Sequence, residues 1–219
     1  MKTLDKVKTI QEKKVRFVIL VTILVIVIEL IIGLNSKSLA IISDSIHMSS
    51  HIIILGINWA AYILIRKLSY KGITTYNSDK ILSLFGFTGG LFLCGSAFMI
   101  IGSAFMIITE SFEHIGNSSE HITNYNYAIV IAIISLITNL ICAIIMHNKN
   151  GKVDYNSRVV YLHLLTDVIT KFGAIIGLIS DMLWNILWID TFIAIISATI
   201  TVNWAKKLLI ETGKILTKN

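Results

Sequence analysis

Long apolar runs separated by short polar segments set the pattern of this chain. Six runs each approach the roughly 20 residues that a helix needs to cross a bilayer; they cover residues 17–34, 39–65, 81–109, 126–146, 159–180 and 184–205. We therefore predict an all-α membrane protein, a bundle of six transmembrane helices. The expected organisation is a basic N-terminal tail at 1–16, a transmembrane transport domain at 17–205 and a short C-terminal tail at 206–219.

The basic residues indicate how this bundle lies in the membrane. All but two of the 19 Lys and Arg residues fall before the first run, in alternate connecting segments or after the last run; the exceptions are Lys37 and Lys171. Lys and Arg accumulate in cytoplasmic loops, so we predict that both termini are cytoplasmic. The net charge of +6 then reflects topology and contact with anionic lipid headgroups, and we expect no nucleic-acid partner.

The composition supports a membrane setting and argues against sites built from cysteine. The chain is 55% hydrophobic and 15% charged, whereas an ordinary soluble domain is about 45–50% apolar even when Gly is counted. Cys94 and Cys142 both lie in apolar runs without a CxxC partner, so neither a disulfide framework nor a thiolate metal site is expected.

Two of the apolar runs carry paired ionisable groups. The stretch SDSIHMSSH contains His47 and His51, and the stretch HLLTD contains His163 and Asp167. Side chains four residues apart lie on one face of a helix, so two adjacent helices would bring all four groups to one point. Ionisable groups inside a membrane are costly, and they mark functional sites by default.

Three imidazoles and one carboxylate form a nitrogen-rich ligand set. Such a set suits zinc, cobalt, nickel or copper better than magnesium or calcium, which prefer oxygen ligands. Imidazole must lose its proton to bind a metal ion, so a site of this kind exchanges protons for metal. Asp44, three residues before His47, either holds an imidazole in its metal-binding tautomer or serves the start of the helix near the outer surface.

The two stretches also resemble the signatures of a known family. NSKSLAIISDSIHMSSHIIILG is similar to the second-helix signature of the cation diffusion facilitator family, SLALLADAxHMLSD, and YNSRVVYLHLLTDVITKFGAIIG is similar to its fifth-helix signature. Asn139 in SLITNL and Asp190 in LWIDTF are further matches. His51 in place of the usual Asp resembles the cobalt and nickel efflux branch. Members of the family usually add a cytoplasmic metal-binding domain after the sixth helix, which these 219 residues do not include.

The resemblance implies a function and its partners. It implies efflux of a divalent metal ion (Co²⁺, Ni²⁺ or Zn²⁺) in exchange for protons, by a homodimer whose transport site is His47, His51, His163 and Asp167. The metal ion is then cargo, and we expect no permanently bound cofactor and no enzymatic activity. We expect a multi-pass protein of a bacterial plasma (inner) membrane.

Lys171 departs from the family pattern, which usually has a small residue there. It follows Asp167 by four residues, and an ammonium at mid-membrane costs about 2.5–3.5 kcal/mol unless it finds a partner. Three hypotheses follow: a tethered cation that leaves when metal arrives, a neutral lysine that takes part in proton exchange, or a site that no longer transports. The third hypothesis favours an alternative function, a non-transporting metal-binding or regulatory subunit of a complete transporter. A membrane metalloenzyme is a weaker alternative, because Asp44 would be its only general base.

Small residues recur at four-residue spacing in the third run, at Gly86 and Gly90 among others. Such spacing allows close helix approach, within the bundle or in a dimer. We expect packing within the bundle.

Overall fold

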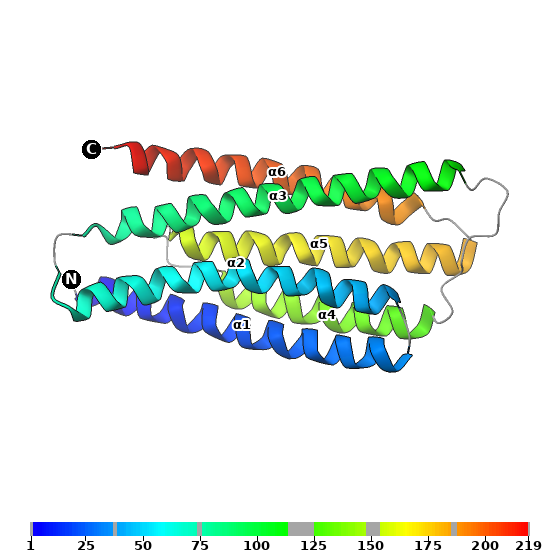
Figure 1. The fold of residues 1–219 in the computed structure, drawn as a ribbon, viewed down its shortest axis with the longest axis horizontal. Coiled ribbons are helices and arrows are strands. Elements are labelled where there is room, and N and C mark those ends of the chain that lie inside the picture. Colours follow the sequence, from blue (N-terminus) through cyan, green and yellow to red (C-terminus); the bar gives the residue numbers. More distant parts are fainter. Residues whose placement is uncertain are drawn as a thin grey trace.

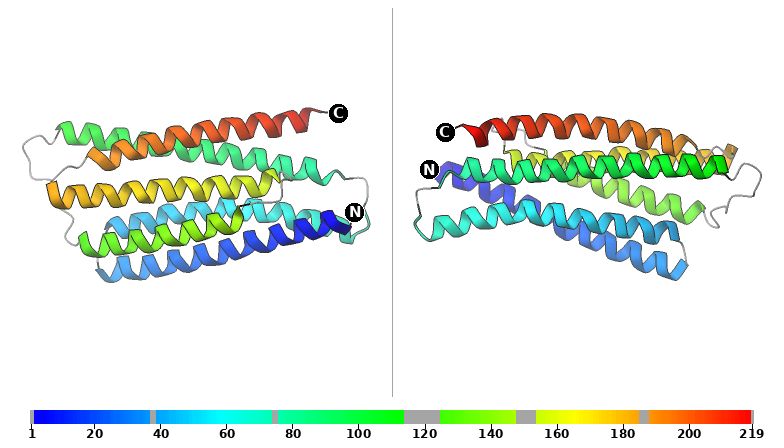
Figure 2. Two further views of the ribbon diagram at one scale, coloured as in Figure 1. Left: turned by 180° about the vertical axis from the view of Figure 1, so that it is seen from behind. Right: turned by 45° about the horizontal axis from the view of Figure 1, so that its top comes forward.

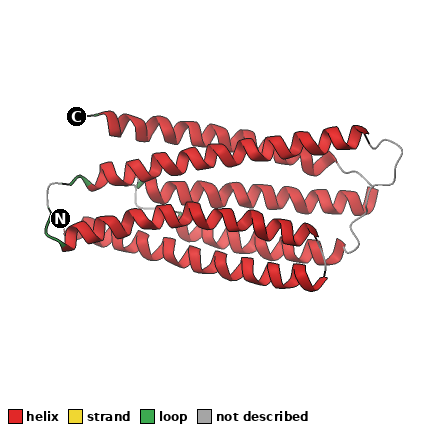
Figure 3. Cartoon of the chain, viewed as in Figure 1, coloured by secondary structure: helices red, strands yellow, loops and turns green. Residues whose placement is uncertain are grey.

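The computed structural model describes residues 2–36, 39–73, 76–113, 125–147, 154–184 and 188–218. These residues form six helices and, in the described ranges, no strand (Figure 3). The helices are α1 (Lys2–Ser36), α2 (Leu39–Tyr70), α3 (Ser78–Glu113), α4 (Tyr125–Met146), α5 (Tyr155–Trp184) and α6 (Trp188–Thr217). All six are long and apolar enough to cross a membrane, which confirms the predicted six-helix fold.

The helices extend beyond the apolar runs, most clearly at the two ends of the chain. α1 begins at Lys2 and α6 continues to Thr217, so both tails are largely helical. Hydropathy marks only the part of a helix that suits hydrocarbon, whereas Lys, Glu and Gln are good helix formers and continue the helix into water. One contact supports this extension: Arg66 Nη1 of α2 donates to Glu12 Oε1 of α1 at 2.6 Å.

The helices run up and down, and both termini lie at the same end of the bundle (Figure 1). We call this end the terminal end; it is the predicted cytoplasmic side. Neighbouring helices pack most extensively as α3 with α6, α1 with α2, and α4 with α5. Figure 2 shows α6 (red) alongside α3 (green) in both views. α5 contacts every other helix, so it is the central helix of the bundle.

Glycines on α3 allow close packing against α5 and α6. A β-carbon on Gly89 would lie 2.5 Å from Val159 Cγ1 of α5, and one on Gly90 would lie 3.1 Å from Leu209 Cδ2 of α6. A β-carbon on Gly86 would lie 3.2 Å from the main-chain carbon of Tyr155. This face of α3 is therefore used inside the bundle, as expected.

Candidate metal centre

The central helix α5 carries two of the predicted ligands, and local sequence fixes where that helix begins. Asp154 precedes the helix, and its Oδ1 accepts from the main-chain N–H groups of Asn156 at 3.0 Å and Ser157 at 3.3 Å. A side chain that accepts from these first free N–H groups is the usual N-cap of a helix. From this start, His163 and Asp167 follow one turn apart and both are buried, with 2% and 8% exposure.

A third predicted ligand, His51, reaches the same point from α2. Nδ1 of His51 lies 3.1 Å from Oδ2 of Asp167, and Nε2 of His163 lies 3.9 Å from the same oxygen. The two imidazole rings are themselves in contact, with centroids 4.3 Å apart and planes tilted by 60°. One potential ligand atom from each of these residues lies within 4.8 Å of the other two. The predicted meeting of α2 and α5 is thus observed for His51, His163 and Asp167.

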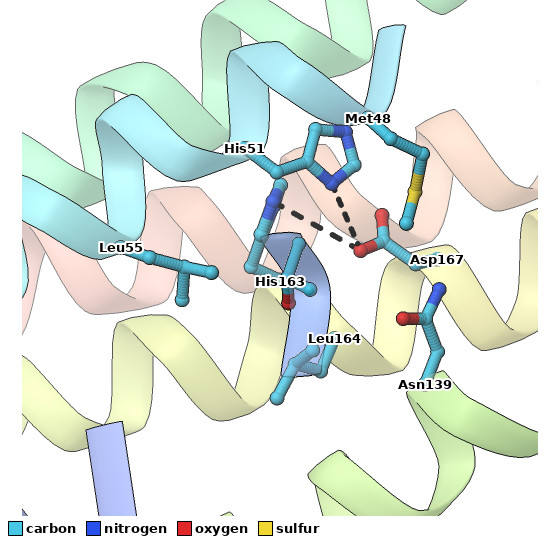
Figure 4. A pocket seen from close by; sticks show the side chains of 8 residues that line it. Met48, His51, Leu55, Asn139, His163, Leu164 and Asp167 are labelled. Atoms are coloured by element: carbon cyan, nitrogen blue, oxygen red, sulfur yellow. Dashed lines mark hydrogen bonds and ion pairs between the residues drawn. The ribbon is translucent and has the colours of Figure 1, made fainter. Parts of the chain in front are cut away.

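These groups face a small pocket in the middle of the bundle (Figure 4). Apart from these three residues, it is lined by Thr22 of α1, Met48 and Leu55 of α2, Asn139 of α4 and Leu164 of α5. Figure 4 shows the Asp167 carboxylate pointing between the two imidazoles, with Asn139 and Met48 on its other sides. The site therefore combines three ionisable groups with a largely apolar wall.

Three other residues were predicted at or beside the site, and the structure places only one of their side chains, that of Lys171. His47 and Asp44 lie on α2, but their side chains lie outside the described part of the structure, so a fourth ligand and a supporting carboxylate stay predictions. Lys171 lies on α5 one turn beyond Asp167 and is buried, with 9% exposure. The neighbouring Asp167 carboxylate forms its hydrogen bond with His51.

The sequence did not identify the pocket residues that come from α1 and α4. Asn139 is a family match without an assigned role, and Thr22 is one of several hydroxyl residues in apolar runs. Both are buried, at 3% and 5% exposure, and Nδ2 of Asn139 has no hydrogen-bond acceptor in the described structure. A single polar residue in an apolar run does not reveal which neighbour it faces, so only the family match at Asn139 could have suggested the site.

The chemistry of the cluster fits a transition-metal ion. A carboxylate between two imidazoles offers one oxygen and two nitrogen donors, and such borderline ligands favour zinc, cobalt, nickel or copper. When no metal is bound, a proton on His51 can satisfy the same carboxylate through the 3.1 Å contact. A metal ion bound to these donors would therefore compete with a proton for the same atoms.

Fold and site together define a polytopic helical membrane protein with a buried cluster of two histidines and an aspartate at the contact between its second and fifth helices. The family model of the cation efflux transmembrane domain matches residues 15–217, nearly the whole chain. The protein therefore belongs to the cation efflux family, whose members transport metal cations out of a compartment. A search of curated proteins finds no significant match.

Proposed function

We propose that this member of the cation efflux family exports cobalt or nickel, and also zinc, in exchange for protons. The observation that carries the proposal is the buried cluster of His51, His163 and Asp167, whose potential ligand atoms lie within 4.8 Å of one another. His47, one turn before His51 on α2, is the fourth ligand. Two imidazoles from α2, one from α5 and one carboxylate then replace the hydration shell of the ion.

The chemistry of the proposed metal ligands couples metal binding to the release of protons. Metal binding requires neutral imidazoles, so an incoming cation displaces protons from His51 and His163. On the opposite side the released metal is replaced by protons. A site that always holds either metal or protons keeps its buried carboxylate neutralised, which is favourable in a low-dielectric interior.

The position of the site suits alternating access. It lies where α2 meets α5, and this contact is less extensive than those of α1 with α2 or α4 with α5. A rocking of the α1–α2 pair against α5 would therefore change the exposure of the site at a small cost in packing. We propose that the transporter works as a homodimer in a bacterial plasma membrane.

Uptake into proteoliposomes tests this function. Purified protein is reconstituted, a pH gradient is imposed, and uptake of cobalt, nickel, zinc and manganese is compared for the native chain and His47→Ala. We expect cobalt or nickel uptake that His47→Ala abolishes, with manganese excluded. A native chain that moves none of the four metals would contradict the proposal.

Burial of Lys171 beside the site favours the second candidate function, a metal-binding or regulatory subunit that does not transport. A tethered ammonium there repels a divalent cation and competes for Asp167. The two candidates are separated by Lys171→Ser in the same assay. A silent native chain that gains transport with Lys171→Ser identifies the regulatory subunit, whereas a native chain that already transports identifies the transporter.

A further inference from the structure

The α2–α5 contact carries a second polar cluster, two helical turns from the histidines toward the terminal end. Asn58 follows His51 by seven residues on α2, and Asn156 precedes His163 by seven residues on α5. Seven residues are nearly two turns, about 10.5 Å along the axis, so each Asn lies on the same helix face as its His. The two helices run antiparallel and keep their register: Asn156 Nδ2 donates to the main-chain oxygen of Asn58 at 2.8 Å.

Both asparagines are fully buried with 0% exposure, and each has an oxygen without a donor. The amide nitrogen of Asn58 is used, since it donates to the main-chain oxygen of Ile54 at 2.7 Å, and that of Asn156 is used as above. Neither Asn58 Oδ1 nor Asn156 Oδ1 has a hydrogen-bond partner in the described structure. Buried polar atoms are almost always satisfied, and exceptions point to a water or an ion.

The surroundings of the pair indicate how a cation would reach it. One turn closer to the terminal end, the Tyr62 hydroxyl donates to Asp154 Oδ2 at 2.5 Å. Asp154 is half-buried at the start of α5, just before the membrane-spanning segment that begins at Tyr155. A carboxylate at this rim attracts divalent cations, and its bond to Tyr62 closes the α2–α5 contact.

An apolar layer separates the pair from the histidines. Leu55 of α2 and Val160 of α5 belong to one core cluster and are 1% and 0% exposed. Along the α2–α5 contact the order is therefore a carboxylate at the rim, the two asparagines, an apolar layer and the metal centre. A cation that entered from the terminal end would meet two uncharged oxygens before the layer.

We propose that Asn58 and Asn156, with Asp154 at the rim, form a second binding site for a partly hydrated divalent cation. We call it the asparagine site. It rests on the proposed function in one respect, that the ion bound there is the one transported. Its donors are two carboxamide oxygens, water and the rim carboxylate. The ion is held there more weakly than at the histidines and moves on when the apolar layer parts.

Binding of Co²⁺ alone to the purified, detergent-solubilised full chain tests the asparagine site independently of transport. The visible spectrum distinguishes the two sites, because a four-coordinate site with nitrogen ligands absorbs intensely and a six-coordinate site of oxygen ligands absorbs faintly. We expect two classes of bound Co²⁺. Asn58→Ala removes only the weaker, faintly absorbing class; this variant keeps the main-chain oxygen that accepts from Asn156. His51→Ala removes only the tighter class.

A matched control and a second variant complete the test. Thr212→Ala removes a buried polar group from α6, where Thr212 is 0% exposed, and leaves both classes unchanged. If Asn58→Ala does not fold, Asn58→Asp replaces it and is expected to bind the weaker class more tightly.

The outcomes separate this proposal from the proposed function. Two unchanged classes in Asn58→Ala, or an unchanged weaker class in Asn58→Asp, overturn the asparagine site, and an ordered water then satisfies the two oxygens. That result leaves the proposed function intact. A native chain that shows only a weak class, removed by Asn58→Ala, supports the asparagine site and contradicts the proposed function.

Discussion

Oδ2 of Asp167 lies 3.1 Å from Nδ1 of His51, although 116 residues separate the two in the chain. Both side chains are buried, and they come from helices that run in opposite directions. A carboxylate and an imidazole buried together in this way need either a proton or a cation between them.

Replacing His51 removes one proposed ligand and the hydrogen-bond partner of Asp167. We expect His51→Ala to weaken Co²⁺ binding by more than the roughly 10–100-fold that loss of a ligand's own hydrogen-bond partner costs. Equilibrium titration of the purified protein with Co²⁺ measures this change. The matched control is His147→Ala, since His147 is exposed at the end of α4, and equal affinity losses in the two variants would contradict the assignment.

Lys171 is expected to oppose metal binding through its charge. Lys171→Ser removes the ammonium beside Asp167, so we expect tighter Co²⁺ binding, by about tenfold for each 1.4 kcal/mol of repulsion removed. The control is Lys207→Ser, because Lys207 is exposed on α6. If Lys171→Ser changed neither the metal affinity nor the transport rate, Lys171 would have no coupling to the site.

Asn139 faces the pocket from α4 and has an amide nitrogen without an acceptor in the described structure. We expect Asn139→Asp to tighten Co²⁺ binding, because it adds a carboxylate at the same distance from the main chain. We expect Asn139→Ala to weaken binding by roughly tenfold, the lower end of losses seen for residues that support ligands. Asn203→Ala on the exposed side of α6 is the control, and a Co²⁺ isotherm unchanged in both Asn139 variants would remove Asn139 from the site.

The closeness of α3 to α5 depends on Gly89. In Gly89→Ala the new β-carbon would lie 2.5 Å from Val159 Cγ1, and a β-branched side chain in a helix has little rotamer freedom to move away. We expect a destabilisation of about 1–3 kcal/mol, typical of overpacked cores, measured as a lower thermal unfolding midpoint in detergent.

Gly95→Ala on the same helix is the control for this packing. A β-carbon there would meet nothing within 4 Å, so the helix propensity of Ala should leave the midpoint unchanged or raise it. Equal midpoints for Gly89→Ala and Gly95→Ala would show that α3 is not held against α5 as described.

The sequence predicted the parts of the protein that repeat a simple spacing. Six apolar runs predicted six helices. Two i, i+4 pairs predicted that α2 and α5 bring together His47, His51, His163 and Asp167, and the structure shows this meeting for the last three. The polar neighbours of the site were not predictable in the same way, because Thr22 and Asn139 are single polar residues in apolar helices. Their direction depends on how α1 and α4 rotate against the rest of the bundle, which is decided by packing.

The contacts at the terminal end were also not predictable from the sequence. Asp154 lies in a short polar linker, and no local pattern relates it to Tyr62, 92 residues earlier. The bond between them results from the antiparallel register of α2 and α5. The helix ends were not predictable either. α1 extends to Lys2 because helix formation there depends on backbone hydrogen bonding and helix propensity, which hydropathy does not report.

Exchange of protons for metal at the buried cluster is the central claim, and lumenal pH in proteoliposomes tests it most directly. Co²⁺ is added outside vesicles that contain a pH-sensitive dye, and metal uptake is recorded together with lumenal pH for the native chain, His51→Ala and His147→Ala. We expect Co²⁺ uptake with simultaneous alkalinisation of the lumen in the native chain and His147→Ala, and neither signal in His51→Ala. Co²⁺ uptake without a change in lumenal pH, or uptake that survives in His51→Ala, would contradict the account.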